Sequence, residues 1–211
     1  MSADERIRHD AFHSQQDRDL YLCAHTLLRH ALSAHTEIPP SSLQFQRNPF
    51  GKPALVSTTR GELPQFNLTH TKGLAACIIA GTRPCGIDLE LVQQKAELLK
   101  IADRWFSAEE VEQLQRLSGE WRYEHFYSLW TLKEALLKAY GCGLLQPLNS
   151  FGFRFPANEH GTIELVHQEH ISTGESWHLE LYSPLSGYRM AVAIAERSGP
   201  IPPIRQYWPE F

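Results

Sequence analysis

The segment FYSLWTLKEALLKAYGCG, residues 126–143, decides the fold predicted for this chain. Apolar residues recur in it at the three- to four-residue spacing of one helical face: Leu129, Leu132, Leu136 and Tyr140. Gly141 and Gly143 then end the helix, because glycine readily adopts the left-handed conformation found at helix C-termini. A second stripe, on the opposite side, carries Glu134 and Lys138. The segment therefore predicts a long core helix with one polar stripe.

Glu134 and Lys138 admit two interpretations. In the order acid then base, four residues apart, they could form an exposed ion pair that stabilises the helix by about 0.2–0.5 kcal/mol. They could instead face a ligand. The segment Gly86-Ile-Asp-Leu-Glu90 favours a ligand, because a strand places Asp88 and Glu90 on the same face. Two such carboxylates repel each other unless a cation lies between them, and a third from the helix would complete an oxygen site for a hard divalent ion such as Mg²⁺.

Length and composition are those of an ordinary soluble globular protein. The chain has 211 residues, enough for one large domain or two small ones, and 42% of them are hydrophobic. A net charge of −4 argues against a general nucleic-acid binder but leaves small anionic ligands open. No apolar run approaches the ~20 residues of a membrane span, and the N-terminus, MSADERIRHD, is too charged for a signal peptide. We therefore expect a cytoplasmic protein that engages neither nucleic acid nor membranes.

The rest of the chain predicts one more long helix and two groups of short strands. The helix covers about residues 17–33 and ends before two prolines. Alternating or apolar runs predict strands at residues 43–45, 66–70, 74–80, 151–155, 162–167, 177–182 and 188–195. We expect residues 81–84 to form a hairpin turn into the acidic strand, and the strands from residue 151 on to form an antiparallel sheet. Ser107 and Glu110 have the spacing of a capping box, so a further helix begins there.

An internal repeat indicates two similar halves. Residues 73–80 resemble residues 187–195, and each segment is preceded at a distance by a long amphipathic helix. The predicted fold class is α+β, a pseudo-dimer of two similar halves, each an antiparallel sheet with a long helix. We place the N-terminal half at residues 1–85 and the C-terminal half at residues 86–211, with the boundary defined to within about ten residues. We expect the active site between the two halves. The duplication makes a monomer the expected state.

Five short motifs follow one another in the order and spacing of a known enzyme family. They are Gly51-Lys-Pro53, Asn67-Leu-Thr-His70, Gly86-Ile-Asp-Leu-Glu90, Arg104-Trp-Phe-Ser107 followed by Glu110, and Trp130-Thr-Leu-Lys-Glu-Ala135 followed by Lys138. Through them nearly the whole chain resembles the 4′-phosphopantetheinyl transferases of the Sfp type, in the branch with a W…KEA helix. Each motif alone is weakly specific, whereas five in order are highly specific.

The resemblance implies a site for coenzyme A and Mg²⁺ between the halves, with Mn²⁺ able to replace Mg²⁺. The implied metal carboxylates are Asp88, Glu90 and Glu134. Lys138 would reach the pyrophosphate or the departing oxygen, and Glu110 or Glu134 would help to deprotonate the incoming serine. The residues implied for the phosphates of coenzyme A are Lys52, Thr69 and His70, with His70 on the 3′-phosphate.

Three features depart from the family pattern. Cys142 stands where the family has a lysine in the loop after the central helix, which puts a phosphate contact from that loop in doubt. Thr69 stands where serine is common and keeps the hydroxyl. The basic N-terminal residues that bind coenzyme A in the family are matched only loosely, by Arg8 and, less well, by Arg18.

The implied reaction transfers the 4′-phosphopantetheine arm of coenzyme A to a serine hydroxyl of an apo acyl or peptidyl carrier protein and releases 3′,5′-ADP. Such carriers serve fatty acid, polyketide and nonribosomal peptide biosynthesis. Phosphoryl transfer needs charge neutralisation and alignment, which an acidic metal site with a lysine can supply. Two alternatives stay open: a hydrolase that uses the same metal to cleave coenzyme A or a nucleotide pyrophosphate, and a non-catalytic binding module. The sequence contains no Walker loop, dinucleotide-binding glycine motif or nucleophile elbow.

Overall fold

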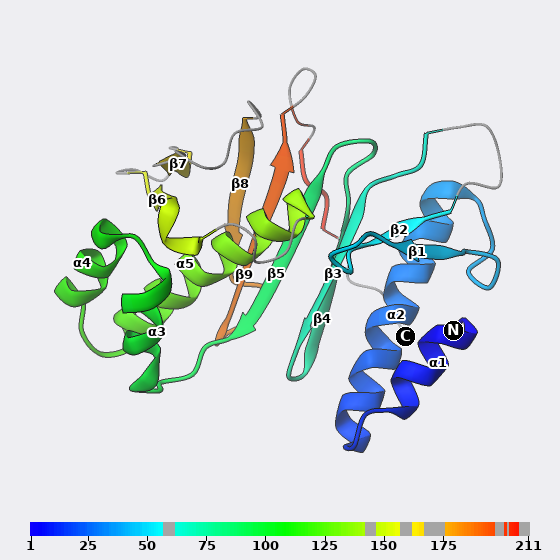
Figure 1. Ribbon diagram of the computed structural model, residues 1–211, viewed down its shortest axis with the longest axis horizontal. Coiled ribbons are helices and arrows are strands. Elements are labelled where there is room, and N and C mark those ends of the chain that lie inside the picture. The colour runs from blue at the N-terminus through cyan, green and yellow to red at the C-terminus, as the bar shows by residue number, and fades with distance from the viewer. Residues whose placement is uncertain are drawn as a thin grey trace.

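The computed structural model of the chain describes residues 1–56, 62–141, 147–156, 162–166, 176–196, 201 and 203–206. Two units, each a long helix with an antiparallel sheet, lie side by side in it (Figure 1). None of the helices in these ranges combines the length and the apolar character needed to cross a lipid bilayer.

The N-terminal half is built on one long helix and one β-hairpin. Helix α2 (Gln15–Thr36) packs against strand β4 (Leu74–Ile79), and β4 pairs antiparallel with β3 (Phe66–Thr71). Leu28 and Leu32 of α2 are buried in the core beneath it. Three shorter elements complete this half: α1 (Ala3–Asp10), β1 (Phe45–Arg47) and β2 (Pro53–Leu55).

The C-terminal half repeats this plan with a larger sheet. Helix α5 (Gly119–Tyr140) packs across β5 (Cys85–Leu91) and β9 (Tyr188–Ala195), and β9 also pairs antiparallel with β8 (Trp177–Tyr182). The predicted leucine stripe of α5 is fully buried. The remaining elements are α3 (Glu97–Trp105), α4 (Ala108–Arg116), the 3-10 helix η2 (Leu148–Ser150), β6 (Gly152–Arg154) and β7 (Glu164–Val166). The predicted α+β class with two similar halves is confirmed.

The halves join where β5 lies beside β3 (Figure 1). The Asn67 side chain on β3 accepts a hydrogen bond of 3.0 Å from the backbone N–H of Ile87 on β5. The hydroxyl of Tyr188 on β9 donates to the Lys72 carbonyl, at the tip of the β3–β4 hairpin, at 2.9 Å. Backbone and side-chain contacts thus connect the two sheets along one edge.

The predicted hairpin between strand 74–80 and the acidic strand is wrong. Strand β4 pairs with β3, through a two-residue turn in which Gly73 has a φ of +82°. A turn of this length and backbone conformation favours pairing of the strands that flank it. Strand β5 pairs instead with the distant β9, from Cys85 opposite Ile194 to Leu91 opposite Tyr188.

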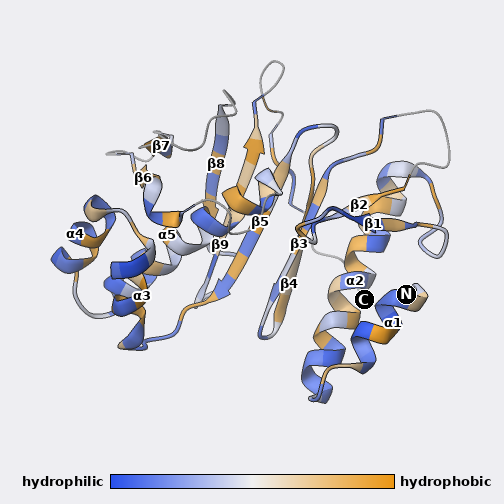
Figure 2. Cartoon of the chain, viewed as in Figure 1, coloured by the Kyte–Doolittle hydropathy of each residue, from blue (hydrophilic) through white to orange (hydrophobic). Residues whose placement is uncertain are grey.

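Other differences from the prediction are local. Helix α1 was not predicted, and Figure 2 shows why: its residues are mostly hydrophilic, so no apolar stripe marks it. The first strand lies at Phe45–Arg47, two residues beyond its expected place. The pair β6–β7 forms a sheet of its own instead of joining β8 and β9. Gly141 ends α5 as expected, with a φ of +68°, whereas Cys142 and Gly143 lie outside the described residues.

Candidate active site

Gly86 brings helix α5 directly onto strand β5. A Cβ at this position would lie 1.9 Å from the carbonyl oxygen of Ala135 and 2.5 Å from the backbone nitrogen of Ala139, both on α5. Only a residue without a side chain permits this approach. Because side chains alternate along a strand, Asp88 and Glu90 share the face of Gly86 and point toward the same helix.

Lys138 of α5 forms an ion pair with Asp88 of β5. Its Nζ lies 2.6 Å from Asp88 Oδ1 and also donates to the Ile87 carbonyl at 3.3 Å. Asp88 is buried, and its second oxygen, Oδ2, has no hydrogen-bond partner among the described residues. Burial raises the pKa of Asp88, and the Lys138 charge acts in the opposite direction, as do the Leu89 N–H and the Thr69 hydroxyl beside the carboxylate. Buried carboxylate oxygens are normally paired, so Oδ2 is available to a ligand.

Glu90 and Glu134 add two partly buried carboxylates at the same place. Burial, followed by the Asp88 charge, raises the pKa of Glu90 to about 7. The same two causes raise the pKa of Glu134. The Asp88 charge therefore acts on both carboxylates, on Glu90 along the same face of β5 and on Glu134 from the facing helix α5. Among the residues that the structure describes, no group of three His, Cys, Asp or Glu side chains is already arranged to hold a metal ion.

Two cavities between the halves share Glu134 and Lys138. The first, of about 250 Å³, is lined by Phe50, Gly51, Lys52, Pro53, Asn67, Glu134, Leu137, Lys138 and Gly141. The second, of about 440 Å³, is lined by Leu68, Thr69, His70, Asp88, Leu89, Glu90, Trp130, Glu134 and Lys138. A ligand that occupied both cavities would therefore pass the carboxylates and the lysine.

The turn that carries Lys52 is anchored to the C-terminus of α5. Lys52 Nζ donates to the carbonyls of Cys85 and Ala139, at 3.0 and 3.1 Å. Asn48 Nδ2 donates to the Gly141 carbonyl at 2.7 Å, and Asn48 Oδ1 accepts from the Lys52 backbone N–H at 2.9 Å. Burial lowers the pKa of Lys52. An ammonium group has three donors, so Lys52 keeps one for a ligand in the first cavity.

Strand β3 places Thr69 and His70 at the second cavity. Thr69 is buried and His70 is exposed. Partial desolvation of the imidazole, followed by the positive charge of Lys138, lowers the pKa of His70. His70 and Lys138 are thus close enough to act on the same anion.

Glu110 lies outside both cavities, in the core of the C-terminal half. It is 1% exposed, its Oε2 lies 2.9 Å from Lys133 Nζ, and the same oxygen accepts from the Ser107 N–H. Its Oε1 accepts from the Phe153 N–H at 3.1 Å. The predicted capping box with Ser107 is present. Because donors within the core occupy both oxygens, Glu110 is not placed to deprotonate a substrate.

The two predicted N-terminal arginines line neither cavity. Arg18 donates to the carbonyls of Phe12 and His13 and to the Gln15 side chain, which holds the loop between α1 and α2. Arg8 is exposed in the last turn of α1.

Two residues that shape the site and one that supports the core beside it were not predicted. Asn67 bridges β3 to β5, and Asn48 fixes the turn before Lys52. Asparagine before a Pro- and Gly-containing turn is a recognisable signal for side chain to backbone bonding. Lys133 points into the core beside Glu110, although it directly precedes Glu134. The contacts of Lys133 have no local signal in the sequence, because its partners are residues 110, 148 and 151.

Comparison with known proteins identifies the family. The family model described as “4′-phosphopantetheinyl transferase superfamily” matches residues 84–193, more than half of the chain, and the one described as “4′-phosphopantetheinyl transferase, N-terminal” matches residues 1–83. The chain is 38% identical over 149 residues to the slr0495 protein of Synechocystis sp., a match that covers 71% of this chain and only 60% of that relative. It is 29% identical over 202 residues to the 4′-phosphopantetheinyl transferase Sfp of Bacillus subtilis, over 95% of this chain and 84% of Sfp.

Among solved structures, a holo-(acyl-carrier-protein) synthase from Bacillus anthracis in complex with CoA is similar to 55% of this chain over 96% of its own length, with 23% identity and a TM-score of 0.46. The matches of the two family models lead to one conclusion: the chain belongs to the 4′-phosphopantetheinyl transferase superfamily.

Proposed function

We propose that this chain transfers the 4′-phosphopantetheine arm of coenzyme A to a serine hydroxyl of an apo acyl or peptidyl carrier protein and releases 3′,5′-ADP. The observation that carries the proposal is Asp88, whose Oδ2 is buried without a described partner where Lys138 and two further carboxylates converge. Membership of the superfamily supports the same reaction. The two family models meet between residues 83 and 84, which supports a division into halves near residue 85.

Asp88, Glu90 and Glu134 are the residues that we assign to Mg²⁺ or Mn²⁺. They fit such an ion, because carboxylate oxygens are the ligands it prefers and because Asp88 Oδ2 has no described partner to give up. Magnesium sites commonly combine one or two carboxylates with waters and substrate phosphates, so three prearranged side chains are not required. When bound, the metal would neutralise and polarise the pyrophosphate of coenzyme A.

In this proposal Lys138 neutralises negative charge and Glu134 accepts a proton. The serine oxygen attacks the phosphorus that bears the pantetheine arm, the phosphorus–oxygen bond to 3′,5′-ADP breaks, and the serine proton passes to Glu134. The raised pKa of Glu134 suits a base that works near neutral pH. Lys138 neutralises the departing oxygen from its place beside Asp88. No residue forms a covalent intermediate, as is usual for phosphoryl transfer.

The phosphates of coenzyme A are assigned to cationic and hydroxyl side chains of the N-terminal half. Lys52 serves the first cavity, and Thr69 and His70 serve the second, with His70 on the 3′-phosphate. Arg8 stays assigned to the same ligand from α1. We assign no such role to Arg18, which is engaged by the α1–α2 loop, or to Glu110, which is engaged in the core.

The test is the intact mass of an apo carrier protein after incubation with this protein, coenzyme A and Mg²⁺. We expect a mass gain of one phosphopantetheine arm, its loss in EDTA, and its recovery with excess Mg²⁺ or Mn²⁺. Asp88→Asn keeps the shape of the side chain and removes its charge, so it should abolish the gain while the chain stays folded by circular dichroism. An equal mass gain in EDTA and in Asp88→Asn would contradict the proposal.

The same reaction mixtures distinguish the other activities. Free phosphopantetheine released without a carrier would identify a hydrolase. Calorimetric binding of coenzyme A with no turnover on any acyl or peptidyl carrier would identify a binding module. A cytoplasmic, monomeric enzyme is part of the proposal, and light scattering of the purified chain tests the monomer.

A further inference from the structure

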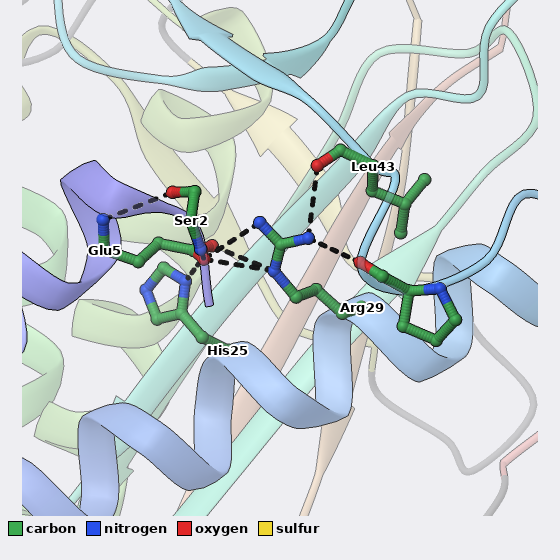
Figure 3. Close-up of polar contacts among 6 residues, drawn as sticks. Ser2, Glu5, His25, Arg29 and Leu43 are labelled. Carbon is green, nitrogen blue, oxygen red and sulfur yellow. Dashed lines mark hydrogen bonds and ion pairs between the residues drawn. The ribbon is translucent and has the colours of Figure 1, made fainter.

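Helix α1 is held on the rest of the chain by a buried carboxylate. Glu5 is 7% exposed and is the buried residue of α1, whereas Ile7 of the same helix is 69% exposed. Helices usually dock through an apolar stripe. Here Glu5 Oε2 accepts from Arg29 Nη2 at 2.8 Å, and Glu5 Oε1 lies 3.1 Å from His25 Nδ1 (Figure 3). The Ser2 N–H donates to Glu5 Oε2 at 2.5 Å. The docking of α1 on α2 therefore depends on an ion pair.

Arg29 also binds the segment that leads into β1. Its Nη1 donates to the Pro40 carbonyl at 2.6 Å and to the Leu43 carbonyl at 3.1 Å, just before β1 (Figure 3). Its guanidinium carbon lies 5.0 Å from the ring centroid of Phe45, the first residue of β1. One arginine thus joins α1, α2 and the start of β1. We name the pair Glu5 and Arg29 the clasp.

Two further cations lie on the elements that the clasp joins. Helix α1 carries Arg8 and strand β1 carries Arg47, whose Nη1 donates to the Gly51 carbonyl at 2.7 Å, directly before Lys52. Arg8 follows Glu5 by about one helical turn and Arg47 follows Phe45 by two strand positions, so both lie on the faces of α1 and β1 that meet at Arg29. Burial and then the charge of Arg8 lower the pKa of Arg47. Like charges held together favour an anion between them.

Tyr21 provides a second, independent indication of a ligand at this place. Its ring lies on α2 beside the rings of Phe12 and His25, with centroids 5.4 and 4.1 Å away. Its hydroxyl is buried and has no hydrogen-bond partner within the described ranges of the chain. Burial and then the charge of Glu5 raise the pKa of this hydroxyl, and the charges of Arg8, Arg47 and Arg29 act in the opposite direction. Buried hydroxyls rarely lack a partner, so an acceptor from a ligand fits here.

We propose that Glu5 and Arg29 are positioning residues for coenzyme A. Glu5 and Arg29 fix α1 and β1 in place. The guanidinium groups of Arg8 and Arg47 and the hydroxyl of Tyr21 can then bind one anionic group of coenzyme A. The proposal rests on the function proposed above, and it adds residues that lie outside the five sequence motifs. Neither residue of the clasp lines the two cavities or contacts Asp88. The clasp therefore acts on the affinity for coenzyme A and not on transfer of the bound arm.

The test compares Glu5→Gln with the natural chain in the full-length protein. Glutamine keeps the size of the side chain and removes its charge, which loosens α1 from Arg29. By calorimetry we expect the affinity for coenzyme A to fall about tenfold, the equivalent of one charge-assisted hydrogen bond. The KM for coenzyme A should rise by the same factor while kcat stays unchanged. Arg6→Ala, at an exposed position of the same helix, is the matched control and should change neither quantity.

A double-mutant cycle separates positioning from general destabilisation. If the clasp acts through the arginines that it places, Glu5→Gln should weaken binding less than about twofold in a chain that already carries Arg8→Ala and Arg47→Ala. Hydrogen exchange of the natural chain adds a measurement without substitutions: coenzyme A should protect the amides of α1. A full tenfold loss in the double-mutant background, or no protection of α1, would overturn the proposal.

The outcomes also separate this proposal from the function on which it rests. If the natural chain fails to bind coenzyme A, the proposed function fails. If the natural chain and Glu5→Gln bind coenzyme A equally, only the role of the clasp fails.

Discussion

Replacing Gly86 by alanine should separate helix α5 from the carboxylates of β5 without changing any charged residue. The added Cβ would lie 1.9 Å from the Ala135 carbonyl oxygen, whereas ordinary contacts begin at 3.4 Å, so α5 must withdraw by the difference, about 1.5 Å. The backbone cannot rotate away as a side chain could. Glu134 and Lys138 directly precede the two displaced alanines, so both functional side chains move with them.

The expected cost in stability is moderate and the expected cost in activity is large. Overpacking of this kind costs about 1–3 kcal/mol of unfolding free energy, and each kcal/mol lowers the melting temperature of a chain of this size by about 2–4 °C. The 2.6 Å contact between Lys138 Nζ and Asp88 Oδ1 cannot survive the displacement. Misplacement of catalytic groups by about 1 Å reduces a rate on the order of 10²-fold.

The assay is the rate of mass gain of an apo carrier, measured together with the melting temperature. Gly81→Ala is the matched control: its φ is +53°, and no atom lies within 4 Å of the added Cβ. It should lose about 1–2 kcal/mol through backbone strain and keep full transfer. Full transfer by Gly86→Ala, or an equal loss of transfer in Gly81→Ala, would refute the reasoning.

Three further predictions concern single side chains. Glu90→Gln should raise the melting temperature at pH 8 but not at pH 4. The pKa of Glu90 is about 7 in the folded chain, against a usual value of 4.5, so the natural chain loses stability as pH rises through this window. Glutamine does not ionise and therefore removes this loss. Equal shifts of the melting temperature at both pH values would contradict this. Glu110→Ala should cost about 3–5 kcal/mol in urea unfolding, because it leaves the buried Lys133 ammonium without its counterion. Lost transfer with unchanged stability would instead give Glu110 a catalytic role. Asn48→Ala should weaken coenzyme A binding about threefold by calorimetry with kcat unchanged, because it frees the turn that carries Lys52, and unchanged affinity would exclude that role.

The sequence predicts those parts of the fold whose pattern is local. The leucines of α5 and the alternation along β5 follow directly from the geometry of helices and strands. Helix α1 has no such pattern, because a single carboxylate, Glu5, replaces the apolar stripe. The pairing of β5 with β9 joins residues about a hundred positions apart, so no turn signal could reveal it.

The same distinction holds for the site. Alternation predicts that Asp88 and Glu90 share a face, and the structure places both at one cavity with Glu134 and Lys138. The spacing of Ser107 and Glu110 predicts the capping box, but the pairing of Glu110 with Lys133 depends on how α4 packs against α5. For the same reason the sequence did not reveal that Gly86 is the point where the helix rests on the strand.

The claim that a metal and the phosphates of coenzyme A meet at Asp88 is tested most directly by electron paramagnetic resonance of Mn²⁺. We predict that Mn²⁺ binds weakly to the chain alone, binds one equivalent more tightly when coenzyme A is added, and loses this coupling in Asp88→Asn. Equal binding of Mn²⁺ by Asp88→Asn and the natural chain, with coenzyme A present, would contradict the claim.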